Sequence, residues 1–228
     1  MLTVLMFFAH PDDEVLAAGA TMKKLSDNGA TIHVAIPATG IHSRRNIEKD
    51  AEQREAALFN LREDCVKALA VVGVQSQNIY LGEFRDNEMD SHSLLDLIHW
   101  LEAIIDKVQP DTIFTHHFNC TNIDHRYCHE AVIVATRPAE NSHITVLTGE
   151  VPSSTGYLKP TQWDPNYYVD VTNKQVRAKI EAMQSYKGEA RPDPHPRSPQ
   201  VLGALAKVRG SESGFMYAEA FMVGKMFG

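Results

Sequence analysis

The sequence predicts an α/β protein with a Rossmann-like, open and mostly parallel sheet and helices on both of its faces. Short apolar runs of strand length alternate with longer helical stretches, which is the pattern of βαβ units. The 228 residues are 43% hydrophobic, enough to bury one sizeable core. We expect a single domain, with an α/β core over residues 1–150 and C-terminal elements over residues 151–228. These last elements should include a lid that covers the ligand-binding side of the sheet.

The core of the domain is predicted to contain five strands and four helices in alternation. The expected strands are residues 3–9, 31–37, 78–81, 112–116 and 144–147. The expected helices are residues 14–28, 45–72, 94–108 and 124–136. Asn28-Gly29 and Gln109-Pro110 are typical stop signals for the helices that precede them. Since helices separate the strands, the strands should pair in parallel.

The alternation weakens after Gly149. Residues 151–166 and the proline-rich residues 188–199 are predicted to be irregular, because proline interrupts both helices and ladders. The remaining tail should contain a strand and two helices, at residues 167–171, 174–186 and 201–209. The last apolar segment, residues 215–227, fits either a buried strand or an interface.

Composition excludes several classes of protein. The net charge of −7 argues against a non-specific nucleic-acid binder, which needs a basic face. Cys65, Cys120 and Cys128 form no CxxC pair, so neither a disulfide framework nor a thiolate metal site is indicated. No apolar run approaches the roughly 20 residues of a membrane span. We expect a cytoplasmic protein, and the sequence leaves open whether it forms a homo-oligomer.

The segment His10-Pro11-Asp12-Asp13-Glu14 follows the first predicted strand. It lies at the carboxyl end of that strand, where open α/β sheets bind ligands. Three adjacent carboxylates repel one another unless a cation lies among them. The segment therefore predicts a metal site. Glu14 is expected at the start of the helix, where the helix dipole favours an acid.

A second polar segment, residues 116–129, follows the strand at 112–116 and leaves the sheet at the same edge. Together, His10, Asp13 and His125 would form a set of two imidazoles and one carboxylate. This set suits Zn²⁺ with an open position for water, although nitrogen and oxygen ligands accept other divalent metals. Asp12 would lie beside the metal and take a proton from water. Asp124 is expected either to orient a ligand ring or to cap the following helix.

These two motifs resemble the PIG-L/LmbE family of zinc-dependent N-deacetylases. The specific part is the Ala-His-Pro-Asp-Asp run after an N-terminal strand, and the similarity extends from Val4 to about Pro138. The tail is similar to a branch of the family that acts on sugars, and the matching residues are Lys179, Tyr186, Glu189, Pro194 to Ser198, Arg209-Gly210 and Ala218 to Phe221. Family members remove an acetyl group from N-acetylglucosamine moieties. The resemblance implies that His10, Asp13 and His125 hold zinc and that Asp12 is the general base.

The resemblance also implies substrate-binding residues. Arg85 and Asp86 match a family Arg-Asp pair near the substrate, and Arg62 loosely matches an arginine near the sugar. Arginine pairs well with phosphate, so a nucleotide-linked N-acetyl sugar is one candidate substrate. The arginines that would bind it are Arg44, Arg45, Arg62, Arg85, Arg126, Arg191 and Arg197. The alternative for each of them is an ordinary surface charge.

Two positions depart from the family pattern. Asn122 stands where many relatives have a histidine that polarises the amide oxygen or protonates the leaving amine. Asparagine donates a hydrogen bond but delivers no proton, so our candidate for the acid is His195, in the proline-rich segment. The alternative is that this segment serves only as a binding lid or subunit contact. Cys120 stands where sugar-acting relatives often carry an aspartate.

Other functions remain open at this stage. One is a zinc amidohydrolase that acts on a non-sugar N-acyl substrate. A non-catalytic binding protein with the same fold is disfavoured, since His10, Asp12, Asp13 and His125 are all present. A nucleotide-binding Rossmann protein is also disfavoured, because the first strand-helix turn lacks GxGxxG and its acids would repel a pyrophosphate.

Overall fold

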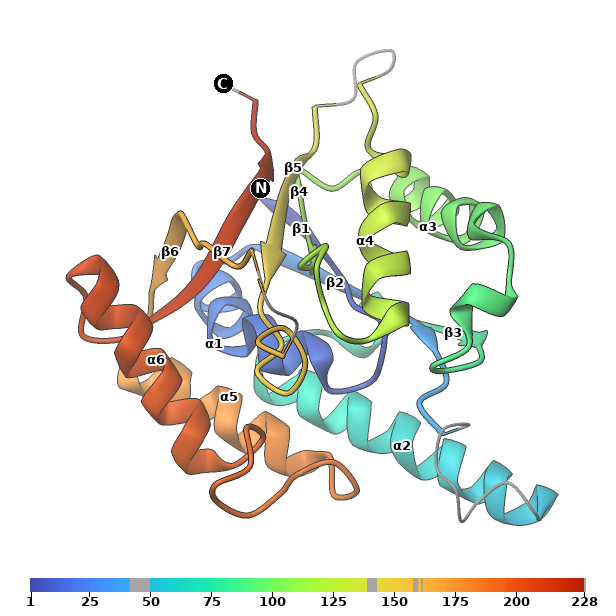
Figure 1. Ribbon diagram of the computed structural model, residues 1–228, viewed down its shortest axis with the longest axis horizontal. Coiled ribbons are helices and arrows are strands. Elements are labelled where there is room, and N and C mark those ends of the chain that lie inside the picture. Colours follow the sequence, from blue (N-terminus) through green and yellow to red (C-terminus); the bar gives the residue numbers. More distant parts are fainter. Residues whose placement is uncertain (42–49, 139–142, 158–159, 161, 228) are drawn as a thin grey trace.

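A seven-stranded sheet, in the order β3-β2-β1-β4-β5-β7-β6, crosses the described part of the computed structural model (Figure 1). The structure describes residues 1–41, 50–138, 143–157, 160 and 162–227. The strands are β1 (Thr3–Phe7), β2 (Thr31–Ala38), β3 (Ile79–Phe84), β4 (Thr112–His116), β5 (Thr145–Gly149), β6 (Tyr167–Asp170) and β7 (Ala218–Lys225). The first five strands are parallel, whereas β7 is antiparallel to both of its neighbours. The predicted α/β class is therefore confirmed.

Helices cover both faces of the sheet (Figure 1). They are α1 (Asp13–Asp27), α2 (Ala51–Val71), α3 (Leu94–Val108), α4 (Ile123–Ala135), α5 (Asn173–Ser185) and α6 (Pro199–Ser213), with short 3₁₀ turns at Ser76–Asn78 and Met89–Ser91. Successive side chains of β1 point to opposite faces of the sheet and therefore belong to two separate hydrophobic clusters. Val4 and Met6 pack with α1, α2 and α5, whereas Leu5 and Phe7 pack with α3 and α4. None of the described helices has the length and apolarity to cross a membrane.

Several element boundaries differ from the predicted ones. Strand β3 continues to Phe84, which pairs with Ala38 across a bulge. Helix α2 begins at Ala51, where the side chain of Asp50 accepts the N–H of Glu52 as a cap. The expected start of this helix at residue 45 lies outside the described residues. Helix α6 is longer than predicted because Ser198 caps it and Pro199 occupies its first turn.

The C-terminal elements belong to the same sheet. The apolar segment that fitted either a strand or an interface forms β7, which pairs with β5 on one side and β6 on the other. Helix α5 packs against α1 and α2, and α6 packs against α5 and β7. The irregular chain between α5 and α6 reaches the carboxyl edge of the parallel strands, as expected for elements that cover this side.

The order of the strands determines where a ligand can bind. β1 lies between β2 and β4, and the helices that follow β1 and β4 cover opposite faces of the sheet (Figure 1). The chain diverges at this point, which leaves a crevice beyond the carboxyl ends of β1 and β4. The two polar segments singled out from the sequence follow these two strands.

Candidate active site

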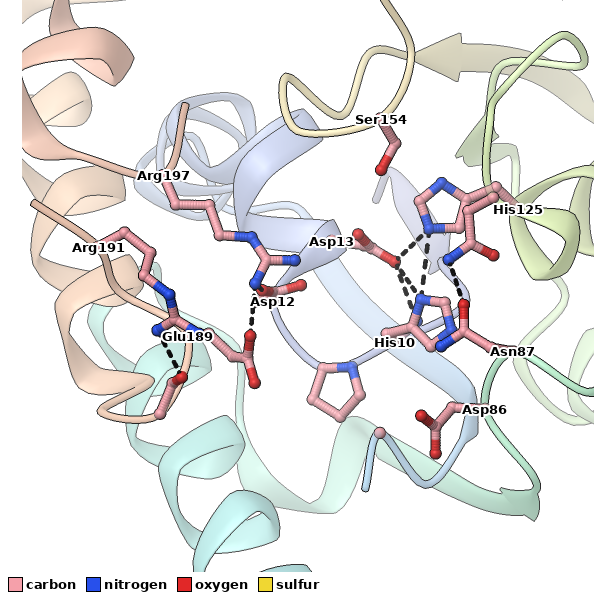
Figure 2. A pocket seen from close by; sticks show the side chains of 14 residues that line it. His10, Asp12, Asp13, Asp86, Asn87, His125, Ser154, Glu189, Arg191 and Arg197 are labelled. Atoms are coloured by element: carbon pink, nitrogen blue, oxygen red, sulfur yellow. Dashed lines mark hydrogen bonds and ion pairs between the residues drawn. The ribbon is translucent and has the colours of Figure 1, made fainter. Parts of the chain in front are cut away.

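Three ligand-type side chains converge beyond β1 and β4 (Figure 2). Oδ2 of Asp13 lies 3.0 Å from Nδ1 of His10 and 3.0 Å from Nε2 of His125. The two ring nitrogens are 3.3 Å apart. His10 and Asp13 come from the turn between β1 and α1, and His125 comes from the first turn of α4. Strands β1 and β4 are hydrogen-bonded neighbours, so they bring residues more than 100 positions apart into one group.

The geometry and charge of this group fit a divalent cation. A tetrahedral zinc ion with bonds of about 2.0–2.1 Å separates its nitrogen and oxygen ligands by about 3.3 Å, close to the observed spacing. Burial acts to lower the pKa of His10, but its hydrogen bonds to Asp124 and Asp13 raise that pKa to about 10. Burial likewise acts to lower the pKa of His125, but the charge of Asp13 and the hydrogen bond to it raise that pKa to about 9. The cluster thus favours a positive charge, either protons or a metal ion that displaces them.

The buried side chain of Asp124 contacts the ring of His10 through the nitrogen that does not face Asp13. Oδ2 of Asp124 lies 2.8 Å from Nε2 of His10, which leaves Nδ1 of that ring toward Asp13. The same carboxylate accepts the backbone N–H groups of Asn87 and Met89. Asp124 thus occupies the position of a ring-orienting acceptor. It is not the helix cap, because the side chain of Asn122 accepts the N–H of Asp124 and caps α4.

The second ligand ring has a sulfur neighbour. Sγ of Cys120 lies 3.1 Å from Nδ1 of His125, on the side of the ring away from Asp13. Cys120 is fully buried. The thiol of Cys120 therefore contacts the ring of His125 and is not among the residues that line the cavity.

Asp12 has an unusual backbone and a buried carboxylate. Its φ of 116° is sparsely populated for an L-residue with a side chain, and such strain concentrates at functional sites. Oδ2 of Asp12 lies 3.2 Å from Nη1 of Arg197, an ion pair outside hydrogen-bond geometry. Burial raises the pKa of Asp12 well above its usual range, although the charge of Arg197 acts to lower it. A carboxylate with a raised pKa suits a general base that works near neutral pH.

Glu14 occupies the first turn of α1 as expected, but its surroundings differ from those of an exposed helix start. The residue is fully buried. Its Oε2 accepts the backbone N–H of Asp12 at 3.0 Å, and its Oε1 accepts the hydroxyl of Tyr186 at 2.5 Å. Burial raises the pKa of Glu14 to about 7. This side chain therefore connects the turn after β1 with the end of α5.

His10, Asp12, Asp13 and His125 border a cavity of about 280 Å³, near the lower end of the range for small-molecule sites. The ligand cluster forms one wall, and the irregular segment after α5 forms the opposite wall (Figure 2). The lining residues are His10, Pro11, Asp12, Asp13, Gly40, Asp86, Asn87, Asn122, His125, Ser154, Gly188, Glu189, Arg191 and Arg197. This strongly polar lining suits a small ligand rich in hydroxyl and amide groups.

Two of the predicted substrate-binding residues lie in the cavity wall, and two lie away from it. Asp86 and Arg197 line the cavity. Arg62 and Arg85 are not among the lining residues. Nη2 of Arg62 lies 3.8 Å from Oε1 of Glu83, and Nε of Arg85 lies 3.1 Å from Oε2 of Glu88. The expectation that they contact substrate gains no support from these positions.

The other candidate residues of the sequence also separate into two groups. Asn122 lines the cavity, and its Nδ2 donates to Asn87. His195 is exposed and is not among the lining residues. Nδ1 of its ring accepts the backbone N–H of Arg197 at 3.1 Å. Its position gives no support to a role as proton donor. Arg126 donates to the backbone carbonyls of Cys120 and Thr121, while Arg44 and Arg45 lie outside the described residues.

Some lining residues were not singled out from the sequence. Asn87 has a φ of 58°, a left-handed conformation that asparagine tolerates better than most residues. Its place after β3, at the same sheet edge as the two motifs, is a signal that would have indicated it. Ser154 and Gly188 come from irregular segments without a recognisable pattern. Glu189 belongs to the tail residues that resemble the sugar-acting branch, but its ion pair with Arg197 depends on the fold.

Comparison with known proteins agrees with this geometry. Residues 5–136 match the family described as PIG-L, GlcNAc-PI de-N-acetylase. A Bacillus cereus protein, described as "probable N-acetyl-alpha-D-glucosaminyl L-malate deacetylase 2", is 32% identical over 113 residues. That match covers 49% of this chain and 50% of the relative, so the chain spans about half the length of this relative.

Two solved structures share the fold over nearly the whole chain. One is the N,N'-diacetylchitobiose deacetylase of Pyrococcus horikoshii, with a TM-score of 0.76, 21% identity, and coverage of 97% of this chain and 83% of that one. The other is GalB of Pseudomonas putida, a 4-carboxy-2-hydroxymuconate hydratase, with a TM-score of 0.72, 20% identity, and coverage of 100% and 98%. The fold thus occurs with more than one reaction, and the site residues must decide between them. The match over residues 5–136 includes both motifs, and on this basis the chain belongs to the PIG-L family.

Proposed function

We propose that this protein is a zinc-dependent N-deacetylase that removes the acetyl group from an N-acetylglucosamine-type amino sugar. The observation that carries the proposal is the convergence of His10, Asp13 and His125 on one point, with the carboxylate of Asp12 bordering the same cavity. The relationship to a glucosaminyl L-malate deacetylase supports the class of substrate. The free cysteines are compatible with a reducing cytoplasm.

The proposed reaction is hydrolysis of an acetamide. Zn²⁺ held by His10, Asp13 and His125 would polarise the acetamide carbonyl and lower the pKa of water. Asp12 accepts the proton of the attacking water, whose oxygen bonds to the carbonyl carbon. The carbon–nitrogen bond then breaks, and Asp12 returns the proton to the departing amine, so that acetate and the free amino sugar are the products. This assignment gives the acid and the base to one carboxylate and needs no contribution from His195.

The neighbouring side chains have defined tasks in this proposal. One N–H of the Asn122 amide donates to Asn87. The second N–H would donate to the oxygen that gains negative charge. Asp86 and the Glu189–Arg197 pair lie at different parts of the wall and bind sugar hydroxyls. Arg197 also places a positive charge next to Asp12, which favours the ionised form of the base.

A nucleotide-linked sugar is a finer form of the same proposal. Arg197 is engaged by two carboxylates, whereas Arg191 donates to the backbone carbonyls of Gly188 and Ala190 in the described contacts. Arg191 is therefore the lining arginine we propose for a phosphate group at the cavity mouth. A neutral sugar would instead depend on the hydroxyl-binding residues.

The proposal is tested by measuring acetate release from a panel of N-acetyl compounds with zinc-loaded protein. The panel contains N-acetylglucosamine, N,N'-diacetylchitobiose, UDP-N-acetylglucosamine and an N-acetylated amino acid. We expect turnover of at least one sugar and none of the amino acid. Turnover of the amino acid alone indicates a non-sugar amidohydrolase. Absence of acetate release from every compound contradicts the deacetylase proposal.

Replacement of the base provides a second test. Asp12→Asn should retain the ligand trio and bind Zn²⁺, but should lower kcat by about 10²–10⁴-fold, because the amide cannot accept the proton. Zinc content, measured by elemental analysis, must equal that of the wild type. Turnover near the wild-type rate in a fully loaded variant would rule out Asp12 as the base.

A further inference from the structure

The base proposed above is held in a conformation that its own backbone disfavours. Asp12 is the residue between the strand-end turn and α1, with φ at 116° and ψ at −28°. An L-residue with a side chain is strained in this region and persists there only where its surroundings enforce the conformation. The surroundings that enforce it therefore control where the carboxylate of Asp12 lies.

Glu14 supplies the contact that enforces this conformation. Its Oε2 accepts the N–H of Asp12 at 3.0 Å, so the carboxylate fixes the peptide bond that leads into the strained residue. The side chain is fully buried and is not among the lining residues of the cavity. Glu14 therefore has no contact with the ligand space and can act on the reaction only through its neighbours.

Tyr186 fixes Glu14 in turn. Its hydroxyl donates to Oε1 of Glu14 at 2.5 Å, and the tyrosine itself is fully buried at the C-terminal end of α5. A buried hydroxyl in this position leaves Oε2 as the oxygen that faces Asp12. The contact joins α5, a helix of the C-terminal region, to the turn after β1.

We propose that Glu14 is a positioning residue for Asp12 and that Tyr186 fixes Glu14 in the orientation this requires. The proposal rests on the assignment of Asp12 as general base. Without Glu14, the N–H of Asp12 loses its acceptor, the strained backbone relaxes, and the carboxylate moves from the position in which it takes the proton of water. Displacements of about 1 Å at such a group lower rates by about 100-fold.

The test uses three variants of the full-length, zinc-loaded protein. The substrate is N,N'-diacetylchitobiose or, if the wild type does not turn this compound over, the panel sugar that it does turn over. Glu14→Ala should lower kcat by about 10–100-fold with KM within about twofold of wild type. Glu14→Gln keeps an oxygen acceptor for the N–H of Asp12 and should restore most of the rate. Tyr186→Phe should fall between these two. Zinc affinity, measured by competition with a chelator, should remain within about threefold of wild type in all three.

A control variant separates positioning from general loss of stability. Val176→Ala removes core packing from α5, where Val176 is buried, but it contacts neither Glu14 nor the cavity. It should lower the denaturation midpoint while leaving kcat of the folded fraction unchanged. Equal kcat losses in Val176→Ala and Tyr186→Phe would overturn the proposal.

A double-variant cycle decides whether Glu14 acts through Asp12. In the Asp12→Asn background, there is no base to position, so Glu14→Ala should lower the residual kcat by less than about twofold. Losses that multiply in the double variant would overturn the proposal. Failure of the proposed function is recognised separately, since Asp12→Asn alone would then leave the rate unchanged. A crystal structure of Glu14→Ala with φ of residue 12 still near 116° would also contradict the inference.

Discussion

Asp12, Asp13 and Glu14 are adjacent in sequence, yet their carboxylates face three different surroundings. Asp13 contacts His10 and His125, Asp12 borders the cavity beside Arg197, and Glu14 is buried against Tyr186. The left-handed backbone of Asp12, between the turn and the helix, separates the directions of its neighbours. Three acidic residues can therefore lie in one segment because each carboxyl group has different surroundings.

At the residue scale, Asp124 is expected to control metal affinity. Asp124→Asn replaces the carboxylate that accepts from Nε2 of His10 and from two backbone N–H groups, so the ligand ring loses orientation and basicity. We predict that Zn²⁺ binds about 10–100-fold more weakly, as measured by competition with a chromogenic chelator.

A matched control exists in another helix. Asp96 also lies in the first turn of its helix, α3, but it is exposed and remote from the ligand residues. Asp96→Asn should leave zinc affinity unchanged. If Asp124→Asn and Asp96→Asn bind zinc equally well, Asp124 does not orient the metal site.

At the scale of elements, α1 contains an irregularity that the sequence does not reveal. Ala18 has φ of −137° and ψ of 19°, so the helix that starts with the ligand Asp13 is interrupted after little more than one turn. The carboxylate of Glu219 in β7 accepts the N–H groups of Ala20 and Thr21, which follow the interruption. Lys179 of α5 donates to the same carboxylate at 2.5 Å. Glu219 of β7, held by Lys179 of α5, thus accepts the N–H groups of α1 that follow the interruption.

Removal of this carboxylate should be costly. Glu219→Ala leaves the buried ammonium of Lys179 and two buried N–H groups without their acceptor, so we predict a loss of about 3–5 kcal/mol in the free energy of unfolding. Urea denaturation followed by circular dichroism measures this loss. Glu212→Ala removes an exposed partner of Arg209 and should cost less than about 1 kcal/mol. Equal losses in the two variants would contradict the role of Glu219.

At the scale of the whole molecule, three polar contacts that are buried or partly buried link the C-terminal region to the core. Tyr186 binds Glu14, Lys179 binds Glu219 beside α1, and Arg209 of α6 binds Glu150 at the end of β5. These three tail residues are among those that resemble the sugar-acting branch of the family. Of the three contacts, the one between Tyr186 and Glu14 reaches the turn that carries His10, Asp12 and Asp13.

Metal binding should therefore stabilise the entire fold. Zn²⁺ at 100 times its Kd favours the folded state by about 2.7 kcal/mol, which corresponds to an increase of about 5–11 °C in Tm for a chain of this size. His125→Ala should abolish this increase. His99→Ala, which replaces an exposed histidine of α3, should retain it. Differential scanning calorimetry measures both, and an unchanged zinc response in His125→Ala would exclude this cluster as the binding site.

The sequence by itself determined the α/β class, the order of the core elements and the convergence of His10, Asp13 and His125. Apolar periodicity marks the strands and helices, and parallel strands direct their carboxyl ends to one edge. The motifs around His10 and His125 could therefore be joined before the fold was known. Their chemistry, two imidazoles and a carboxylate, is local and can be recognised without coordinates.

Only the tertiary structure decided which of the remaining side chains face the cavity. His195 and Arg197 are two residues apart in one irregular segment, yet Arg197 contacts Asp12 whereas His195 is exposed. The cause is that no periodicity fixes side-chain directions in such a segment, so the direction of each side chain depends on long-range contacts. The surroundings of Glu14 also depend on a long-range contact, because its partner Tyr186 lies 172 residues away along the chain.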